Sequence, residues 1–419
     1  MFVFSIELYR IEIWPLTIKY QSLLSLTTKS KQERASVMRI WVVLVVWIVL
    51  AGVAWGAVQA QDRPEHPDVS DFWAGRATWE QEFFSVGLPV GESDTVDMGG
   101  GVLWSYLHAS HQSAGVIDQC GEAVAFPGCL TRWESTDNGK SFSLPVAMCL
   151  LPCLACPCDD QRDHITTQQY PRVVFTPERH YMAYEWHAQT MLRTSQDGTV
   201  WSAWEYLRVP IGTWNDSYAP CTEVERIGAH PNIRGQVDNC QIGGPPGIYV
   251  EGDMLYIFVT AGSAPSHLRC YKGNRFGDLR DLQLCEHDPL FGGAREYGDP
   301  ALRGADANAY FDFRYVSSAD VIKARDGRYY AFYEGIRGPD VLERGMDSQY
   351  ALALARSVDG EIDDVWEKFP DNPILGDLDF NWGIGHADVI ILDGVTYLYT
   401  ATSQTTRGRY KLVWTQDAP

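Results

Sequence analysis

The fold is decided by the stretch Asp-Val-Ile-Lys-Ala-Arg-Asp-Gly-Arg-Tyr-Tyr-Ala-Phe-Tyr-Glu at residues 320–334. An apolar run reaches an Asp-Gly pair at 326–327, and an aromatic-rich run leads away from it. Glycine and aspartate favour tight turns, because glycine tolerates positive φ and aspartate bonds to nearby backbone groups. A Ser-Val-Asp-Gly turn follows at 357–360, and Trp366 stands six residues beyond it. The stretch therefore predicts a β-hairpin that continues into a third and a fourth strand.

Three further copies of this pattern lie along the chain. One runs from Asp388 through the turn 393–394 to Tyr399, one from Pro171 to Glu185, and one starts at Gly247 with a turn at 252–253. A single four-stranded sheet cannot bury both of its faces alone, so repeats of this kind must stack on one another. Stacked radially, they form a β-propeller. We expect an all-β, five-bladed propeller with long, disulfide-stapled loops.

The blades and the loops between them can be placed approximately. The first blade contains 101–107 and ends near 135–142, and the others span 165–210, 245–285, 315–370 and 385–416. The long loops are 143–168, 209–246 and 286–314. Loops of this length in a compact domain usually carry function.

The N-terminal region indicates export. An uncharged apolar run covers 41–58 after Arg39, and Val58-Gln59-Ala60 offers the small residues of a cleavage site. We expect translation to start at Met38, residues 1–37 to be an upstream mis-start, and 38–60 to be a signal peptide. The alternative is an uncleaved membrane anchor, since the run is just long enough to span a bilayer. Either case places 61–419, one propeller domain, in a secreted or cell-surface protein.

Charge narrows the class of ligand. Residues 61–419 carry 28 basic and 51 acidic residues, a net charge of −23. So acidic a surface excludes nucleic acid and anionic membranes as partners, and suits a neutral or cationic ligand.

All ten cysteines lie after residue 61, and an even number in an exported protein indicates disulfides. The simplest pairs are local: Cys120–Cys129, Cys221–Cys240 and Cys270–Cys285. The cluster Cys149, Cys153, Cys156 and Cys158 has two interpretations, disulfides or a zinc site. An oxidising compartment favours disulfides.

The stretch Ser135–Phe142 fits the Asp-box pattern Ser-x-Asp-x-Gly-x-x-aromatic. A shorter form stands at 195–201 and a partial copy at 357–360. In such a turn aspartate caps the backbone, glycine takes positive φ and the aromatic side chain packs between sheets. We assign these turns a structural role and no chemistry.

The repeats at 320–334 and 355–360 resemble the five-bladed propeller glycoside hydrolases of the arabinanase, xylosidase and invertase type, and the Asp boxes resemble those of six-bladed sialidases. This resemblance implies a secreted hydrolase that cleaves a glycosidic bond in a neutral glycan at a carboxylate-lined axial funnel. It implies no cofactor and is compatible with a structural calcium ion. Fold alone does not establish function, so two alternatives stay open: a non-catalytic carbohydrate- or protein-binding propeller and a sialidase-like hydrolase.

Glycoside hydrolysis needs two carboxyl groups across the scissile bond. The resemblance implies a base Asp from the first blade, an orienting Asp from the second and an acid Glu from the third. Asp97, just before the expected inner strand of blade 1, matches the base, and Asp163 matches the orienting residue. Blade 3 has no Glu at its tip, so Glu185 or Glu334 must act as the acid.

Glu185 is preferred as the acid because Trp186 and His187 follow it. Further candidates for substrate binding lie at the same rim: Arg172, Trp186, His187, Asp320, His386 and Asp388. We predict no catalytic metal. Structural alternatives remain, because Asp320 and Asp388 could cap strand starts. Glu185 and Glu334 could likewise form ion pairs with Arg172 and Arg314.

Overall fold

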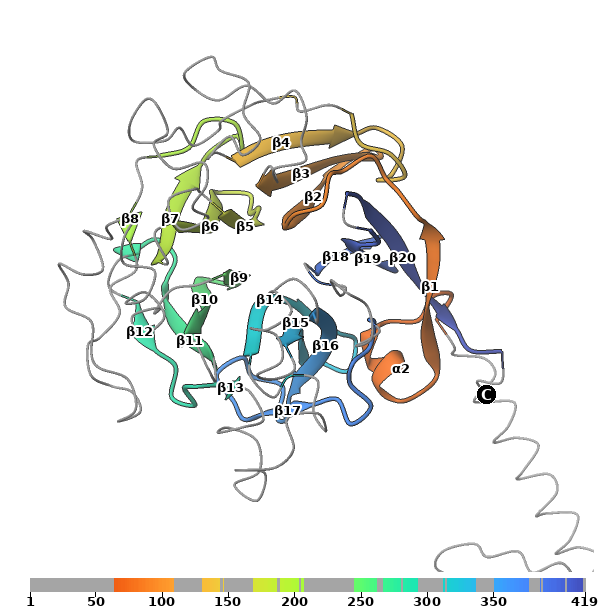
Figure 1. Ribbon diagram of the computed structural model, residues 1–419. Coiled ribbons are helices and arrows are strands. Elements are labelled where there is room, and N and C mark those ends of the chain that lie inside the picture. Colours follow the sequence, from red (N-terminus) through yellow and green to blue (C-terminus); the bar gives the residue numbers. More distant parts are fainter. Residues whose placement is uncertain are drawn as a thin grey trace, which may run out of the picture. The chain divides into compact units, whose positions relative to one another are not determined.

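Five β-sheets surround a common axis in the computed structural model (Figure 1). The structure describes residues 64–108, 130–143, 146, 169–186, 189–202, 205–206, 245–261, 267–279, 282–292, 312, 315–336, 350–376, 385, 387–403 and 405–416. Within them, residues 66–418 form one unit, and a second unit, Met1–Glu65 with Pro419, is described only at residues 64–65. The five blades expected from the repeats are confirmed.

Strands within each blade are antiparallel neighbours, and in blades 1 to 4 the innermost strand comes first in the chain. Blade 1 consists of β2 (Ser93–Gly99), β3 (Val102–His108) and β4 (Leu130–Ser135). Blade 2 consists of β5 (Gln169–Val174), β6 (His180–Trp186), β7 (Gln189–Ser195) and β8 (Glu205–Tyr206). Blade 3 consists of β9 (Pro246–Glu251), β10 (Met254–Ala261), β11 (His267–Asn274) and β12 (Gln283–Leu284), and β13 (Phe291–Gly292) also pairs with β11.

Blade 4 consists of β14 (Tyr315–Lys323), β15 (Tyr329–Ile336), β16 (Tyr350–Ser357) and β17 (Trp366–Lys368). Blade 5 consists of β18 (Asp388–Leu392), β19 (Val395–Ala401), β20 (Arg407–Trp414) and β1 (Ala77–Phe83). Its outermost strand, β1, comes from the other end of the propeller domain and pairs with β20 through Trp79 and Leu412. Residues 77–83 therefore close the ring, a role that the repeats did not indicate.

Apolar side chains from neighbouring blades pack against each other to form the core. Between blades 3 and 4, Phe258, Val321 and Tyr333 belong to one buried cluster. Each such side chain contributes about 1.5–3 kcal/mol on burial. The blades approach closely at Gly247, where a Cβ atom would lie 2.4 Å from the carbonyl oxygen of Ala319. Only glycine permits that distance.

The turn at 135–142 caps the outer part of blade 1. The Asp137 carboxylate accepts hydrogen bonds from the backbone N–H groups of Lys140 and Ser141, at 3.0 and 2.9 Å. Gly139 has a φ of 73°, and the buried ring of Phe142 meets Tyr399 of blade 5 edge-on, with 5.8 Å between ring centroids. This turn therefore packs blade 1 against blade 5.

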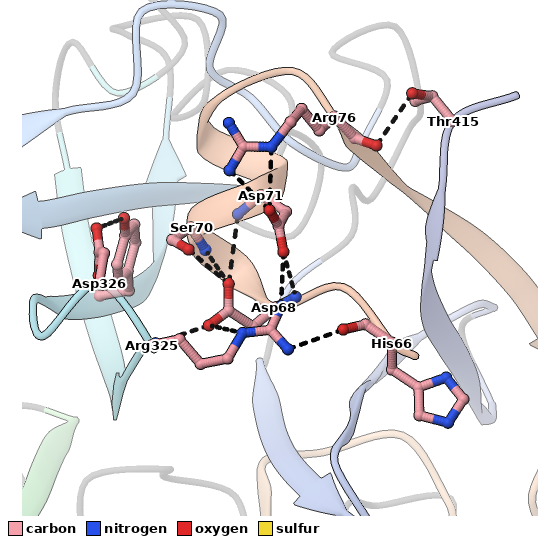
Figure 2. A network of polar contacts seen from close by, with 9 residues as sticks. His66, Asp68, Ser70, Asp71, Arg76, Arg325, Asp326 and Thr415 are labelled. Atoms are coloured by element: carbon pink, nitrogen blue, oxygen red, sulfur yellow. Dashed lines mark hydrogen bonds and ion pairs between the residues drawn. The ribbon is translucent and has the colours of Figure 1, made fainter. Parts of the chain in front are cut away.

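A short helix, α2 (Val69–Trp73), docks on blade 4 before the chain enters blade 5 (Figure 2). Asp68 caps it by accepting hydrogen bonds from the N–H groups at 70 and 71. Arg325, in the turn between β14 and β15, forms ion pairs with Asp68 at 3.2 Å and with Asp71 at 2.7 Å. Arg76 bonds the other oxygen of Asp71 at 2.7 Å. These contacts fix the entry of β1.

One predicted disulfide is confirmed, since Cys270 and Cys285 are bonded with their Cα atoms 5.3 Å apart. The other eight cysteines lie outside the described residues, so their pairing stays a prediction. The N-terminal apolar run also lies outside them. Among the described helices none is both long and apolar enough to cross a membrane.

Candidate functional site

Equivalent residues of the five inner strands meet at the axis. The register of each inner hairpin pairs Asp94 with Tyr106, Arg172 with Ala183, Gly247 with Phe258, Asp320 with Phe332 and Asp388 with Tyr399. We call the five inner-strand residues the axial ring: Asp94, Arg172, Gly247, Asp320 and Asp388. Four of the five are ionisable residues, and the glycine occupies the close contact with blade 4.

The carboxylates of the axial ring link neighbouring blades. Each carboxylate accepts a hydrogen bond from a backbone N–H group of the next blade. The donor is the residue directly after the axial-ring residue of that blade. The pairs are Asp94 with Val173, Asp320 with Val389 at 2.6 Å, and Asp388 with Thr95 at 3.0 Å. Asp320 and Asp388 thus accept backbone hydrogen bonds, as expected if their role is structural. They lie in the ring, and nothing in these contacts requires a substrate.

Arg172 is the cation of the axial ring and is 1% exposed. Its guanidinium donates hydrogen bonds to the carbonyl oxygen of Ser93 and to Oγ of Ser318, both at 2.9 Å. Burial by itself lowers the pKa of Arg172. The negative charges of nearby carboxylates, Asp320 and Asp94 before the others, together raise this pKa by more, so the net shift is upward. The ion pair between Arg172 and Glu185, one of the structural alternatives, is not among these contacts.

Carboxylate oxygens of Asp94, Asp320 and Asp388 lie within 4.8 Å of one another, close enough to share a cation. Burial raises the pKa of Asp94 well above its usual value, and the charge of Asp320 adds to this. Burial raises the pKa of Asp320 to about 6, although Arg172 opposes the shift. The Arg172 guanidinium offsets part of this negative charge, and the three carboxylates are the place in the described structure where the structural calcium ion allowed by the sequence would fit.

In each blade, the second-strand residue that pairs with the axial ring is followed two positions later by a further equivalent residue. We call these five residues the mouth layer: His108, Glu185, Thr260, Glu334 and Ala401. The three ionisable side chains of this layer are buried: His108 is 6%, Glu185 7% and Glu334 2% exposed. Glu185 pairs with Gln169, the first residue of β5, and Glu334 pairs with Ser317 near the start of β14. Both glutamates thus lie toward the end of the propeller where the inner strands start.

Glu185 has the chemistry of a proton donor. Its Oε2 atom is buried and has no hydrogen-bond partner among the described residues. Burial raises the pKa of Glu185 to about 8, and the negative charge of Glu92 contributes. A carboxyl group in this state keeps its proton at neutral pH and can donate it.

Glu334 has a different electrostatic environment, because its charge interacts with that of the fully buried Arg407. Burial lowers the pKa of Arg407 to about 10, while Asp388, Glu92 and Glu334 act against the shift. The Arg407 guanidinium also donates a hydrogen bond to the carbonyl oxygen of Tyr399 at 2.9 Å. Glu334 therefore interacts with a guanidinium, whereas the charge acting on Glu185 is that of another carboxylate, Glu92.

Irregular backbone accompanies both glutamates. The register of β5 shifts between Gln169 and Arg172, and that of β14 shifts between Ser317 and Asp320. Within these bulges Tyr170 has a φ of 52° and Ser318 a φ of 49°, which non-glycine residues rarely adopt. Bulges and strained residues of this kind concentrate near functional sites, where they redirect side chains.

Glu92 belongs to the site, although the sequence motifs did not reveal it. It is 1% exposed, stands two residues before Asp94, and its Oε2 accepts a hydrogen bond from Ser318 Oγ at 2.9 Å. Its carbonyl oxygen accepts the N–H of His108, so Glu92 stands opposite the mouth layer, as Gln169 does in blade 2 and Ser317 in blade 4. Had β2 been recognised as the inner strand, this equivalence would have indicated Glu92.

The structure does not bring Asp97 to this cluster. The inner strand of blade 1 is β2, and Asp97 lies inside it near the turn to β3. Its side chain is exposed and accepts the N–H of Gly99 at 2.8 Å, so it caps the hairpin turn. The strand that was predicted to be the innermost of blade 1 is β3, the second strand. Asp94 occupies the axial position instead.

Several predicted residues cannot be placed. Asp163, His187, His386 and Arg314 lie outside the described residues, as does the side chain of Trp186. Their roles stay predictions. Of the four predicted catalytic residues, the structure places Glu185 and Glu334 in the mouth layer.

No family model matches the chain, and no curated protein does. Solved structures similar to it include a xylan β-1,4-xylosidase from Bacillus halodurans, with TM-score 0.48 and 15% identity over 80% of this chain and 55% of that one. An α-L-arabinofuranosidase from Podospora anserina, in complex with cellotriose, has TM-score 0.45 and 10% identity over 82% and 98%. An endo-arabinase from Bacteroides thetaiotaomicron has TM-score 0.42 and 14% identity over 80% and 97%.

The chain spans about half the length of the xylosidase. Likeness at such low identity concerns the fold, so the function has to be argued from the site itself.

Proposed function

We propose that this protein is a glycoside hydrolase that cleaves a glycosidic bond in a neutral glycan, with Glu185 as general acid and Glu334 as its carboxylate partner. The observation that carries the proposal is Glu185, a buried carboxyl group whose pKa is raised to about 8 and whose Oε2 has no partner among the described residues. Protonating the leaving oxygen requires an acid that still holds its proton at neutral pH.

The second carboxyl group must be ionised to act as base or nucleophile. Glu334 occupies the position of Glu185 in blade 4, and its charge interacts with the guanidinium of Arg407. Acid and base roles require two carboxyl groups in different environments, and the burial of Glu185 beside the charge of Glu92 and the interaction of Glu334 with Arg407 provide them. The anomeric configuration of the first product, followed by NMR, distinguishes a nucleophilic Glu334 (retention) from a base that activates water (inversion).

A neutral substrate fits the charges around the site. Carboxyl groups outnumber guanidinium groups there: Glu92, Glu185, Glu334, Asp94, Asp320 and Asp388 stand against Arg172 and Arg407. A sialidase-like reaction would need arginines that bind the substrate carboxylate. Arg172 instead donates to Ser93 and Ser318 and is 1% exposed. An anionic sugar is therefore disfavoured.

We also infer that the protein is exported, to the cell surface or beyond. The Cys270–Cys285 disulfide supports this, because such bonds form and persist in oxidising compartments.

The test compares wild-type protein with Glu185→Gln on neutral aryl glycosides and on arabino- and xylo-oligosaccharides. We expect kcat/KM on an oligosaccharide to fall by about 10²–10⁴-fold. The loss should be much smaller on a dinitrophenyl glycoside, because that leaving group departs without a proton. Glu178→Gln is the matched control, since Glu178 lies on the same hairpin with its side chain 54% exposed. Full activity of Glu185→Gln on every cleaved substrate would refute the assignment, and glycan binding without any cleavage would favour the binding propeller.

A further inference from the structure

Ser318 occupies an unusual position beneath the mouth layer. It is fully buried in the β14 bulge, with a φ of 49°. Its backbone N–H donates to Oγ1 of Thr260 in blade 3 at 3.1 Å, and Thr260 donates onward to the carbonyl oxygen of Pro245 at 2.9 Å. Glycine would adopt this backbone conformation without strain. A serine here indicates that its side chain is needed.

The Ser318 hydroxyl connects two charged groups from other blades. It accepts a hydrogen bond from Nη2 of Arg172 at 2.9 Å and donates one to Oε2 of Glu92 at 2.9 Å. The guanidinium can only donate, so the hydroxyl oxygen accepts from Arg172 and its own hydrogen goes to Glu92. One hydroxyl therefore joins blades 1, 2 and 4 across the axis.

We propose that Ser318 is a positioning residue that couples Arg172 to Glu92 and thereby holds the Glu92 carboxylate beside Glu185. This inference rests on the proposed function, in which Glu185 is the general acid. The strained backbone and the buried hydroxyl then have one purpose, which is to keep a negative charge at a fixed place next to the proton donor.

The surroundings of Glu185 are consistent with this role. On the neighbouring strands, Glu185 pairs with the uncharged residues Gln169 of β5 and Thr190 of β7. β5 also carries the cation Arg172, and the first residues of β9 in the next blade are uncharged. Besides burial, the charge of Glu92 is what raises the pKa of Glu185. Removing the Ser318 hydroxyl removes a hydrogen bond to the Glu92 carboxylate. The position of that carboxylate is then less fixed, so its negative charge raises the pKa of Glu185 less.

The experiment uses Ser318→Gly, which removes the hydroxyl and also relieves the backbone strain, so the variant is expected to fold. Asn138→Gly is the matched control, because Asn138 also has positive φ (59°) but lies in the outer turn of blade 1. The pKa of Glu185 is followed by NMR on protein with ¹³C-carboxyl-labelled glutamate, with Glu185→Gln identifying the signal. The pH dependence of kcat/KM is measured on the same proteins.

We expect the pKa of Glu185 in Ser318→Gly to fall by about half a unit or more, and the basic limb of the kcat/KM profile to move with it. Asn138→Gly should change neither. A folded Ser318→Gly variant with the wild-type titration of Glu185 would overturn the inference. The NMR titration needs no substrate, so it decides the role of Ser318 even if no glycan is cleaved and the proposed function fails.

Discussion

Glu185→Gln should make the protein more stable while it abolishes the acid. A carboxyl group whose pKa is higher in the folded than in the unfolded chain costs stability wherever the unfolded chain has lost its proton. For Glu185 that cost begins above the ordinary value of 4.5 and grows until the folded value of about 8. Glutamine has the shape of the protonated acid and never ionises, so the variant escapes the penalty.

The magnitude follows from the two pKa values of 4.5 and about 8. Each pH unit between them costs about 1.4 kcal/mol, so at pH 7 the free energy of unfolding should be about 3 kcal/mol higher in the variant. At pH 5 the difference should shrink to less than about 1 kcal/mol. With a urea m-value of about 3 kcal/mol per M, the midpoint should shift by about 1 M at pH 7.

Urea unfolding of both proteins between pH 5 and 8, followed by tryptophan fluorescence, measures this difference. The gap between the two midpoints must widen as pH rises, because the wild type alone carries the cost of Glu185, whereas buried carboxyl groups such as Asp320 titrate in both proteins. A gap that stays constant with pH, or a variant less stable than wild type at pH 7, would show that Glu185 is not held protonated. The general-acid assignment would then lose its physical basis.

Three further outcomes are expected. Arg172→Met should lower the free energy of unfolding by about 3–5 kcal/mol, and by more at pH 8 than at pH 5, because the ring carboxylates lose their cation; a neutral effect on the urea midpoint would contradict this. Cys270→Ser should cost about 3 kcal/mol, as expected for a loop of this size, and reducing agent should remove the difference from wild type. Asp97→Asn should keep turnover within about twofold, because its exposed side chain caps a turn; a loss of catalysis would restore Asp97 as the base.

Much of the architecture could be predicted from local patterns. Alternating strands and Asp-Gly turns, such as 320–334, are set by interactions between near neighbours, and they predicted the blades. The fixed offset within a hairpin also predicted that Glu185 and Glu334 share one end of the propeller. The spacing of Cys270 and Cys285 was sufficient for their pairing, because a short loop brings its ends together readily.

The centre of the site depends on contacts that no local pattern contains. Glu92 and Ser318 are 226 residues apart, and they meet only because blades 1 and 4 face each other across the axis. Asp97 was predicted as the base because the strand containing 101–107 resembled an inner strand, whereas β2 precedes it and β1 belongs to blade 5. Turn chemistry and hydrophobic alternation act over a few residues and therefore determine blades. Which side chains meet at the axis depends on strand register and ring closure, and these are properties of the whole fold.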